Sequence, residues 1–247
     1  MMAHLQSPKR IFYLIFFTTL LVKVLIAGFM PMTGDEALFY VWSLFPQMGY
    51  YDHPPMIAWW IYLMRHLSDT ALFVRMPAVI LNHGIVLGLM ALLRSYKVDD
   101  SRAYLVGSIY LLLPVSVLGV LITTDTPLIA FSFMATYFFI KGIQEEYSGK
   151  FIQPSFMWVG IFLGLAFLSK YFAVLLGFAF IAILIFRRQW NRLIWVLLCA
   201  TPFGLVNLFW NLNHCWQNIM FNLVNRHQDY SGNPLTNVAV YLLLIIY

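Results

Sequence analysis

The chain has 247 residues, of which 62% are hydrophobic and only 10% are charged, and its mean hydropathy is +0.78. Soluble domains average about 45–50% apolar and about 25% charged residues, so a water-soluble globular fold is excluded. The net charge of +5 comes from basic residues scattered between hydrophobic runs, without the stripe that nucleic-acid binding needs. We therefore expect an integral membrane protein with no nucleic-acid partner.

The hydrophobic runs are about 18–20 residues long, which favours membrane helices over the short alternating strands of a barrel. We expect an all-α, polytopic transmembrane bundle forming a single domain over residues 1–247. The first span is expected at 11–30, as an uncleaved anchor, because a signal peptide would have a shorter apolar core. Further spans are expected at 71–92, 104–122, 126–143, 193–210 and from about 237. The 31-residue stretch 156–186 contains Lys170, and we expect two short spans there.

Basic residues are distributed unevenly between the two sides of this layout. Ten lie in the connections on one side: Lys9, Arg10, Arg94, Lys97, Arg102, Lys141, Lys150, Arg187, Arg188 and Arg192. Three lie on the other: Arg65, Lys170 and Arg226. The positive-inside rule then predicts a cytoplasmic N-terminus and an outer 31–70 loop. We expect the membrane to be a bacterial inner or plasma membrane, with this loop on the periplasmic side. A single helix over 156–186 would instead move the 211–236 loop to the cytoplasm.

The 31–70 loop contains two apolar, aromatic segments, 37–45 and 56–67, each about three turns long. Tryptophan and tyrosine favour the membrane interface, so two helices lying in the interfacial plane are expected. The turn between them would hold Asp52 and His53 at membrane level, and Pro55 suits the first turn of the second helix.

Asp35, Glu36, Asp52, His53, Asp125 and Lys170 fall at the same predicted outer face. Carboxylates beside a cation suit general-base activation of a hydroxyl, or a divalent metal ion, next to an anionic leaving group. Simpler interpretations stay open. Asp125 before Thr-Pro suits a helix N-cap, Glu36 suits a first-turn acid facing water, and Lys170 suits a side chain that snorkels to the interface.

Two further patterns follow. His214 and His227 flank a loop rich in tryptophan and asparagine, and their spacing matches no zinc signature, so we expect hydrogen-bonding or acceptor-side residues there, together with Arg226. Two small-xxx-small pairs are expected to form helix-packing faces. These pairs are Gly84 with Gly88 and Gly160 with Gly164.

Several short motifs occur in a fixed order. They are Gly34-Asp-Glu-Ala-Leu-Phe-Tyr40, Gly49-Tyr-Tyr-Asp-His-Pro-Pro-Met-Ile-Ala-Trp59, Arg75-Met-Pro-Ala78, Thr123-Thr-Asp-Thr-Pro127, Leu168-Ser-Lys-Tyr171 and Trp210-Asn-Leu-Asn-His214. In this combination the chain resembles the C-type membrane glycosyltransferases, the superfamily of dolichyl-phosphate-mannose protein mannosyltransferases and aminoarabinose (lipid A) transferases. The resemblance covers nearly the whole chain. It implies transfer of a sugar from a polyprenyl phosphate to an acceptor on the outer or lumenal side.

The resemblance also implies roles for single residues. Asp35 matches the family's base or essential acid, with Glu36 beside it, and Asp125 matches the acid of the second outer loop. Asp52 matches an acid that binds a metal in some relatives. In those relatives the acid is followed by a lysine that binds the donor phosphate, and this chain has His53 at that position. Lys170 matches the family's lysine and is the expected phosphate ligand, with His53 and Arg75 as weaker candidates.

These observations predict an inverting glycosyltransferase whose acceptor is a glycolipid, a glycan or a protein. The chain is shorter than such enzymes, and it ends at Ile-Ile-Tyr247 within an expected span. Either this helix is terminal and short, or the chain is a truncated form of a longer protein. Two alternatives stay open: a catalytically silent fragment or assembly subunit, and a transporter, which would place acids near the membrane midplane.

Overall fold

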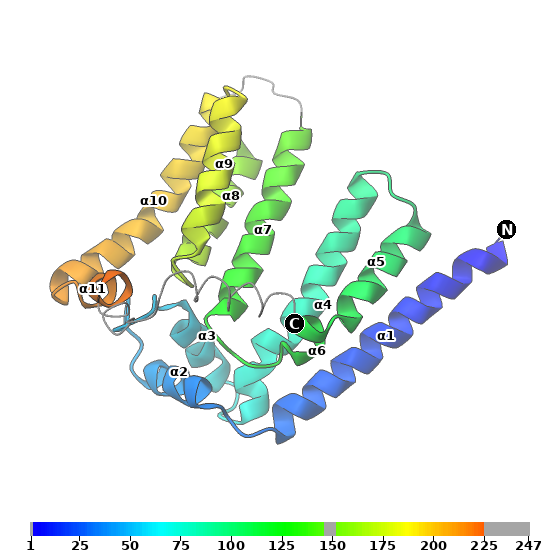
Figure 1. Cartoon of the computed structure of the whole chain (residues 1–247), viewed down its shortest axis with the longest axis horizontal. Coiled ribbons are helices and arrows are strands. Elements are labelled where there is room, and N and C mark those ends of the chain that lie inside the picture. The colour runs from blue at the N-terminus through cyan, green and yellow to red at the C-terminus, as the bar shows by residue number, and fades with distance from the viewer. Residues whose placement is uncertain (1, 146–151, 225–247) are drawn as a thin grey trace, which may run out of the picture.

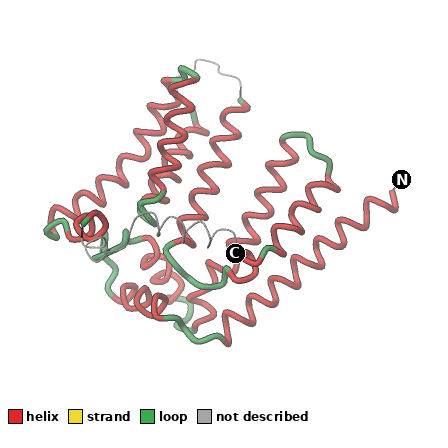
Figure 2. Tube along the Cα trace, in the orientation of Figure 1, coloured by secondary structure: helices red, strands yellow, loops and turns green. Residues whose placement is uncertain are grey.

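The computed structural model describes residues 2–145 and 152–224. The regular elements in these ranges are all helices, as predicted (Figures 1 and 2). They are α1 (Met2–Phe29), α2 (Gly34–Leu44), α3 (Met56–Arg65), α4 (Ala71–Ser95), α5 (Asp100–Leu112), α6 (Pro114–Leu118), α7 (Asp125–Gln144), α8 (Pro154–Phe167), α9 (Ala173–Phe186), α10 (Trp190–Asn213) and α11 (Gln217–Leu223). Within α1 the stretch Pro8–Phe29, and the whole of α4, α7 and α10, are long and apolar enough to cross a membrane. The all-α, polytopic prediction is confirmed.

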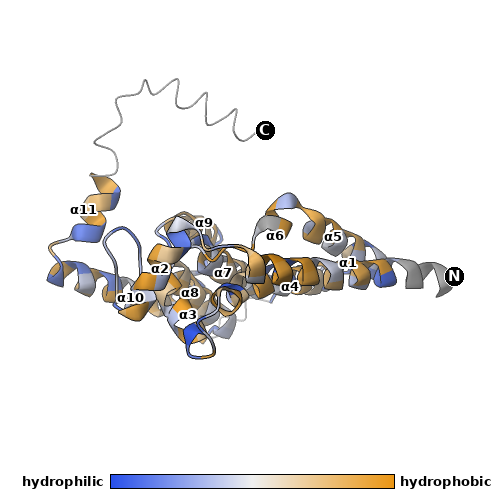
Figure 3. Ribbon diagram, turned by 90° about the horizontal axis from the view of Figure 1, so that it is seen from below, coloured by the Kyte–Doolittle hydropathy of each residue, from blue (hydrophilic) through white to orange (hydrophobic). Residues whose placement is uncertain are grey.

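The long helices form two packed groups (Figure 1). In one group, α1, α4 and α5 bury Phe12, Val86 and Leu111 between them. In the other, α7, α8, α9 and α10 share a core that includes Phe156 and Val196. Figure 3 shows the long helices coloured mainly as hydrophobic, with hydrophilic residues gathered near helix ends and in the connections. This is the distribution that a bilayer requires of a helical protein.

The expected single span at 104–122 is wrong. Helix α5 ends at Leu112, Leu113 adopts an extended conformation, and Pro114 begins the short helix α6. Proline disfavours a helical conformation in the residue before it and cannot donate a backbone hydrogen bond, so the helix breaks there. The 13 residues of α5 reach only about 20 Å at about 1.5 Å per residue, less than the roughly 30 Å of a hydrocarbon core.

The expected division of 156–186 into two helices is confirmed. At 14 residues each, however, α8 and α9 are shorter than the about 20 residues of a full crossing, so their expected role as two spans stays a prediction. Helices α8 and α9 are separated by the turn 168–172, which contains Lys170. The chain therefore returns to the end of the bundle where the 31–70 segment, the start of α7 and α11 also lie (Figure 1). The segment expected from about 237 lies outside the described residues.

The glycine pairs have different surroundings. A Cβ atom on Gly160 or Gly164 would overlap α10, and one on Gly88 would overlap the ring of Phe133 in α7. These three glycines let neighbouring helices approach closely, as predicted. Gly84 has no atom within 4 Å of such a Cβ, so its predicted packing role is wrong.

Two short helices, α2 and α3, occupy the 31–70 segment, as expected. Phe39 of α2 and Ile57 and Ile61 of α3 are buried against Val74 of α4 and Ile122, which precedes α7. The apolar faces of both helices thus dock on the end of the bundle. This packing fixes the turn between them, which contains Asp52 and His53, next to the membrane helices.

Candidate functional site at one end of the bundle

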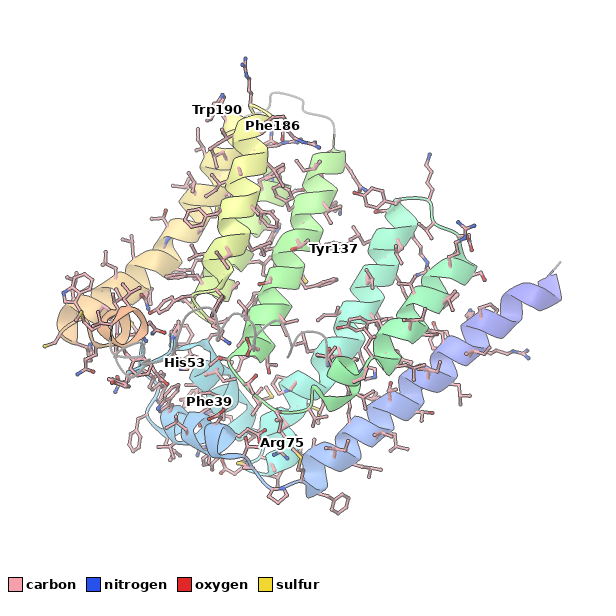
Figure 4. The ribbon with its side chains drawn as sticks, in the orientation of Figure 1. Phe39, His53, Arg75, Tyr137, Phe186 and Trp190 are labelled. Atoms are coloured by element: carbon pink, nitrogen blue, oxygen red, sulfur yellow. The ribbon has the colours of Figure 1, made fainter. Side chains whose placement is uncertain are left out.

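The described candidate residues come from segments that meet at one end of the bundle. These residues are Asp35, Glu36, Asp52, His53, Arg75, Asp125, Lys170 and His214. Figure 4 shows His53 and Arg75 at this end, near α2 and α3. Arg226 and His227 lie outside the described residues.

Lys170 and Asp125 form an ion pair. The Lys170 Nζ donates hydrogen bonds to both carboxylate oxygens of Asp125, at 2.8 and 3.0 Å. Asp125 is the first residue of α7, whose N-cap is Thr124, so its carboxylate contacts Lys170 and does not cap the helix. The side chains keep 26% (Lys170) and 50% (Asp125) of their surface exposed. Exposed ion pairs contribute only about 0–1 kcal/mol, so a phosphate could replace Asp125 at the ammonium group with little loss of stability.

Asp35 lies in the first turn of α2 and is exposed. It makes no hydrogen bond or ion pair within the described ranges. A capping box orients this turn, because the Thr33 side chain accepts from the Glu36 backbone N–H while the Glu36 carboxylate accepts from the Thr33 N–H. Asp35 is therefore a free carboxylate on a rigidly placed turn.

Glu36 and Arg75 form a buried ion pair, and neither side chain has any exposed surface. Arg75 Nε and Nη2 donate to the two oxygens of Glu36, both at 2.7 Å. The remaining Arg75 donors bind backbone carbonyls at the end of α1 and just beyond it, at Ala27, Met30 and Pro31. All five N–H groups of the guanidinium are thus used.

This pair joins four segments of the chain. Besides Arg75 and Thr33, Glu36 accepts from the Ile122 N–H at 3.1 Å. Burial alone would raise the pKa of Glu36, but the hydrogen bonds from Arg75, Thr33 and Ile122 outweigh it and hold the pKa below its ordinary value. With no exposed surface and these groups engaged, the pair holds α1, α2, α4 and the segment before α7 together. We therefore assign Glu36 and Arg75 a positioning role, in place of the predicted contacts with substrate.

Asp52 and His53 are neighbours in the turn between α2 and α3. The Nδ1 of His53 lies 3.0 Å from Oδ2 of Asp52, without the angle of a hydrogen bond. Oδ1 of Asp52 is buried and has no partner in the described part of the chain. A catalytic metal usually has three protein ligands, and no group of three or more His, Cys, Asp or Glu residues with a suitable arrangement occurs among the described residues. These residues do not fit a metal centre, so we derive no step through a metal.

His214 follows the last residue of α10. Its ring stacks on Trp210 with 4.2 Å between the ring centroids, and its Nδ1 lies 2.8 Å from the Trp210 carbonyl oxygen. Trp210 in turn packs against Gly49, where a Cβ atom would overlap the indole ring. His214 thus supports the 49–55 turn, and its predicted acceptor-side role stays a prediction.

A network of asparagine and tyrosine side chains at the same end was not predicted. Its members are Asn207 and Asn211 of α10, Asn218 and Asn222 of α11, and Tyr171 of the α8–α9 turn. Asparagines four residues apart lie on one helix face, and this spacing in an otherwise apolar helix was the available signal. Thr33 could also have been found, because Thr-x-x-Glu is the pattern of a capping box.

An apolar cavity of about 520 Å³ lies beside the Lys170 turn. It is lined by Phe167, Tyr171, Phe172, Val174, Leu175, Asn207, Ile219, Asn222 and Leu223. The Nζ of Lys170 lies 5.7 Å from the ring centroid of Phe172, one of these lining residues. The site thus combines an ammonium group with an adjoining apolar space at a helix end.

The chain was compared with known proteins. The family model described as dolichyl-phosphate-mannose-protein mannosyltransferase matches residues 52–210. The chain belongs to this family. The chain is also 29% identical over 187 residues to the lipid A galacturonosyltransferase RgtD of Rhizobium johnstonii. That alignment covers 73% of this chain but only 38% of the Rhizobium protein, so the chain spans less than half the length of this relative. No solved structure matches the chain.

The mannosyltransferase-family match contains both turns of the candidate site. Asp52, His53, Asp125 and Lys170 lie within residues 52–210, whereas Asp35 precedes this segment. The family resemblance expected from the sequence motifs is confirmed.

Proposed function

We propose that this mannosyltransferase-family protein transfers a sugar from a polyprenyl-phosphate donor to an acceptor hydroxyl at the membrane surface. The observation that carries the proposal is the partly exposed Lys170–Asp125 pair beside the apolar cavity. A lipid phosphate has an anionic head and a long hydrocarbon chain. An ammonium group next to an apolar space complements both parts of such a donor.

The proposed reaction is a single displacement at the anomeric carbon. The acceptor hydroxyl oxygen forms the new bond to this carbon, and its proton passes to the Asp35 carboxylate. The bond between the anomeric carbon and the phosphate oxygen breaks, and the polyprenyl phosphate leaves with the electron pair. Lys170 stabilises the charge that develops on this leaving group. Attack from the opposite face inverts the anomeric configuration.

The acceptor is proposed to be a glycolipid, with a glycan or a protein as the other candidates. The name of the Rhizobium relative, a lipid A galacturonosyltransferase, supports a glycolipid. The position of the carboxylates supports transfer over transport. Every Asp and Glu in the described ranges lies in a connection, in α2 or at the end of a helix, and a transporter would place some near the midplane.

Substitution of Lys170 tests the donor site. Lys170→Met is expected to weaken binding of an undecaprenyl-phosphate sugar in nanodiscs by roughly ten- to a hundredfold, because a charge-assisted hydrogen bond to phosphate is lost. Lys170→Arg keeps the charge and is expected to retain most of the affinity. Lys141→Met, at the opposite end of α7, is the matched control and should bind like wild type. Near-native affinity for Lys170→Met would make Lys170 an interfacial anchor and would remove the basis of the proposal.

The site is proposed to face the outer or periplasmic side, on the basis of the ten-to-three distribution of basic residues. Cys215 is exposed at this end, so it provides a natural probe. In a Cys199→Ser background, a membrane-impermeant maleimide is expected to label Cys215 in intact spheroplasts. A cysteine placed at Lys97, at the other end of the bundle, should react only after permeabilisation. The reverse pattern would place the site in the cytoplasm.

A further inference from the structure

The two turns of the candidate site are connected directly, because the Met56 N–H donates to the Leu168 carbonyl oxygen at 3.1 Å, and a second connection runs through α11. Tyr171 directly follows Lys170, and its hydroxyl accepts a hydrogen bond from Asn207 Nδ2 at 2.9 Å and donates to Asn218 Oδ1. Asn218 is fully buried, and its Nδ2 donates to the Tyr50 carbonyl oxygen at 2.7 Å. Asn222, one turn later in α11, donates to the Asp52 carbonyl oxygen at 3.0 Å. A continuous path of hydrogen bonds thus runs from the Lys170 turn to the Asp52 turn.

The side chains of Asp52 and His53 make few contacts of their own: they lie 3.0 Å from each other, and the His53 ring lies 6.1 Å from the rings of Phe39 and Trp42. Oδ1 of Asp52 and Nδ1 of His53 have no hydrogen-bond partner in the described part of the chain. Their placement therefore depends largely on the backbone of the turn. The docking of α2 and α3 and the Met56–Leu168 backbone bond hold this backbone, and Asn218 and Asn222 add two hydrogen bonds to its carbonyl groups. Asn218 and Asn222 act on Asp52 and His53 only through this backbone.

Polar contacts anchor the buried side of helix α11. It has seven residues, and Asn218 is the buried one among them. The chain enters α11 through Cys215 and Trp216, two consecutive non-glycine residues with φ of 52° and 58°. This left-handed conformation costs energy for residues with a side chain, so it must be held by its surroundings. Asn211 does so, because its carbonyl oxygen and Oδ1 accept from the Trp216 and Ile219 N–H groups at 2.9 and 3.4 Å.

We propose that α11 is a latch whose Tyr171–Asn218 hydrogen bond positions the Asp52–His53 turn against the Lys170 turn. Ile219, Asn222 and Leu223 of α11 also line the apolar cavity, so the same helix shapes the cavity and holds the turn. Tyr171, Asn218 and Asn222 are positioning residues in this proposal. Its consequence for sugar transfer rests on the proposed function, whereas the latch itself does not.

A cross-linking experiment tests the latch without any assay of activity. Tyr51 and Phe221 are in contact, with 4.7 Å between ring centroids, and join the turn to α11. Cysteines at these two positions, in a Cys199→Ser, Cys215→Ser background of the full chain, are expected to be joined by a short bismaleimide cross-linker, which spans the larger backbone separation of two side chains that meet at their rings. Tyr171→Phe removes only the hydroxyl group of the tyrosine, and Asn218→Ala removes the amide oxygen that accepts its hydrogen bond. Tyr171→Phe is expected to slow cross-linking by roughly 3- to 10-fold. Asn218→Ala is expected to slow it at least as much, because it also removes the hydrogen bond to the Tyr50 carbonyl.

The double variant and a matched control sharpen this test. Tyr171→Phe with Asn218→Ala should slow cross-linking less than the product of the two single effects, because both remove the same bond. Asn213→Ala should leave the rate unchanged, since the exposed Asn213 binds only the Phe209 carbonyl of its own helix within the described ranges. Unchanged cross-linking in Tyr171→Phe and Asn218→Ala would overturn the latch.

Sugar transfer then tests the positioning role. Tyr171→Phe and Asn218→Ala are expected to lower kcat more than they raise the KM of the donor, and closing the 51–221 cross-link should restore kcat in Asn218→Ala. Slowed cross-linking with unchanged kcat in both variants would overturn the positioning role. If the wild-type chain transfers no sugar, the proposed function fails, while the cross-linking rates still decide for or against the latch.

Discussion

Replacing Asp35 by asparagine is expected to lower the rate of sugar transfer by roughly 10²–10⁴-fold, the loss typical of a missing general base. The amide keeps the shape of the side chain but cannot accept the proton of the acceptor hydroxyl. Asp35 is exposed, has no partner in the described ranges and lies on a turn fixed by the Thr33–Glu36 capping box. The substitution should therefore leave folding and donor binding close to wild type. Single-turnover transfer of a labelled sugar from an undecaprenyl-phosphate donor measures the effect.

Asp69→Asn is the matched control for this substitution. Asp69 is also an exposed acid of the 31–70 segment, but Arg65 and the Tyr40 hydroxyl occupy its carboxylate. Transfer by Asp69→Asn should stay within about twofold of wild type, because surface substitutions away from a site have small effects. If Asp35→Asn turns over as fast as wild type and is inserted normally, Asp35 is not the base. Asp125 would then be the better candidate.

Replacing Arg75 by methionine is expected to lower the free energy of unfolding by about 3–5 kcal/mol, because it leaves the Glu36 carboxylate buried without its cation. The carbonyl groups of Ala27, Met30 and Pro31 would also lose their donor. Unfolding by SDS titration in mixed micelles measures the change. Arg65→Met is the control, since Arg65 pairs with the largely exposed Asp69, and it should cost about 0–1 kcal/mol.

A second substitution separates two contributions to the lost free energy of unfolding: the unpaired buried charge and the lost packing. Glu36→Leu combined with Arg75→Met should be more stable than Arg75→Met alone, because no charge is then left unpaired. If Arg75→Met and Arg65→Met lower the free energy of unfolding equally, the Glu36–Arg75 pair does not stabilise the fold as proposed. The pKa of Glu36 lies below its ordinary value of 4.5, so the stabilisation from the pair is complete above that pH. It is lost only as the pH falls through the lowered pKa.

These two predictions assign different roles to two adjacent residues: Asp35 is proposed to take part in catalysis, and Glu36 stabilises the fold. Asp35 and Glu36 are adjacent in the sequence, and both were candidates for catalysis. In the structure, one is exposed at the start of α2 and the other is buried against Arg75. Successive residues of a helix point in directions about 100° apart, so one of the pair faces the core and the other faces away.

The sequence by itself determined the membrane helices. Because the bilayer core offers no hydrogen-bond partners, long apolar runs must form helices, and α1, α4, α7 and α10 appear where hydropathy predicts them. Lys170 likewise marked the break between α8 and α9, since a charged side chain is costly within lipid. The failure at 104–122 had a visible local cause in Pro114, which the hydropathy criterion ignores.

Only the tertiary structure decided which polar side chains are partners. Glu36 and Arg75 are 39 positions apart, Lys170 and Asp125 are 45 apart, and Asn218 binds the carbonyl of Tyr50 across 168 positions. Hydropathy and helical periodicity specify which face of a helix is apolar, but they do not specify which other helix it meets. The packing of the helices decides which helices meet. It buries the ion pair of Glu36 and Arg75 between them and leaves Asp35 and Lys170 accessible.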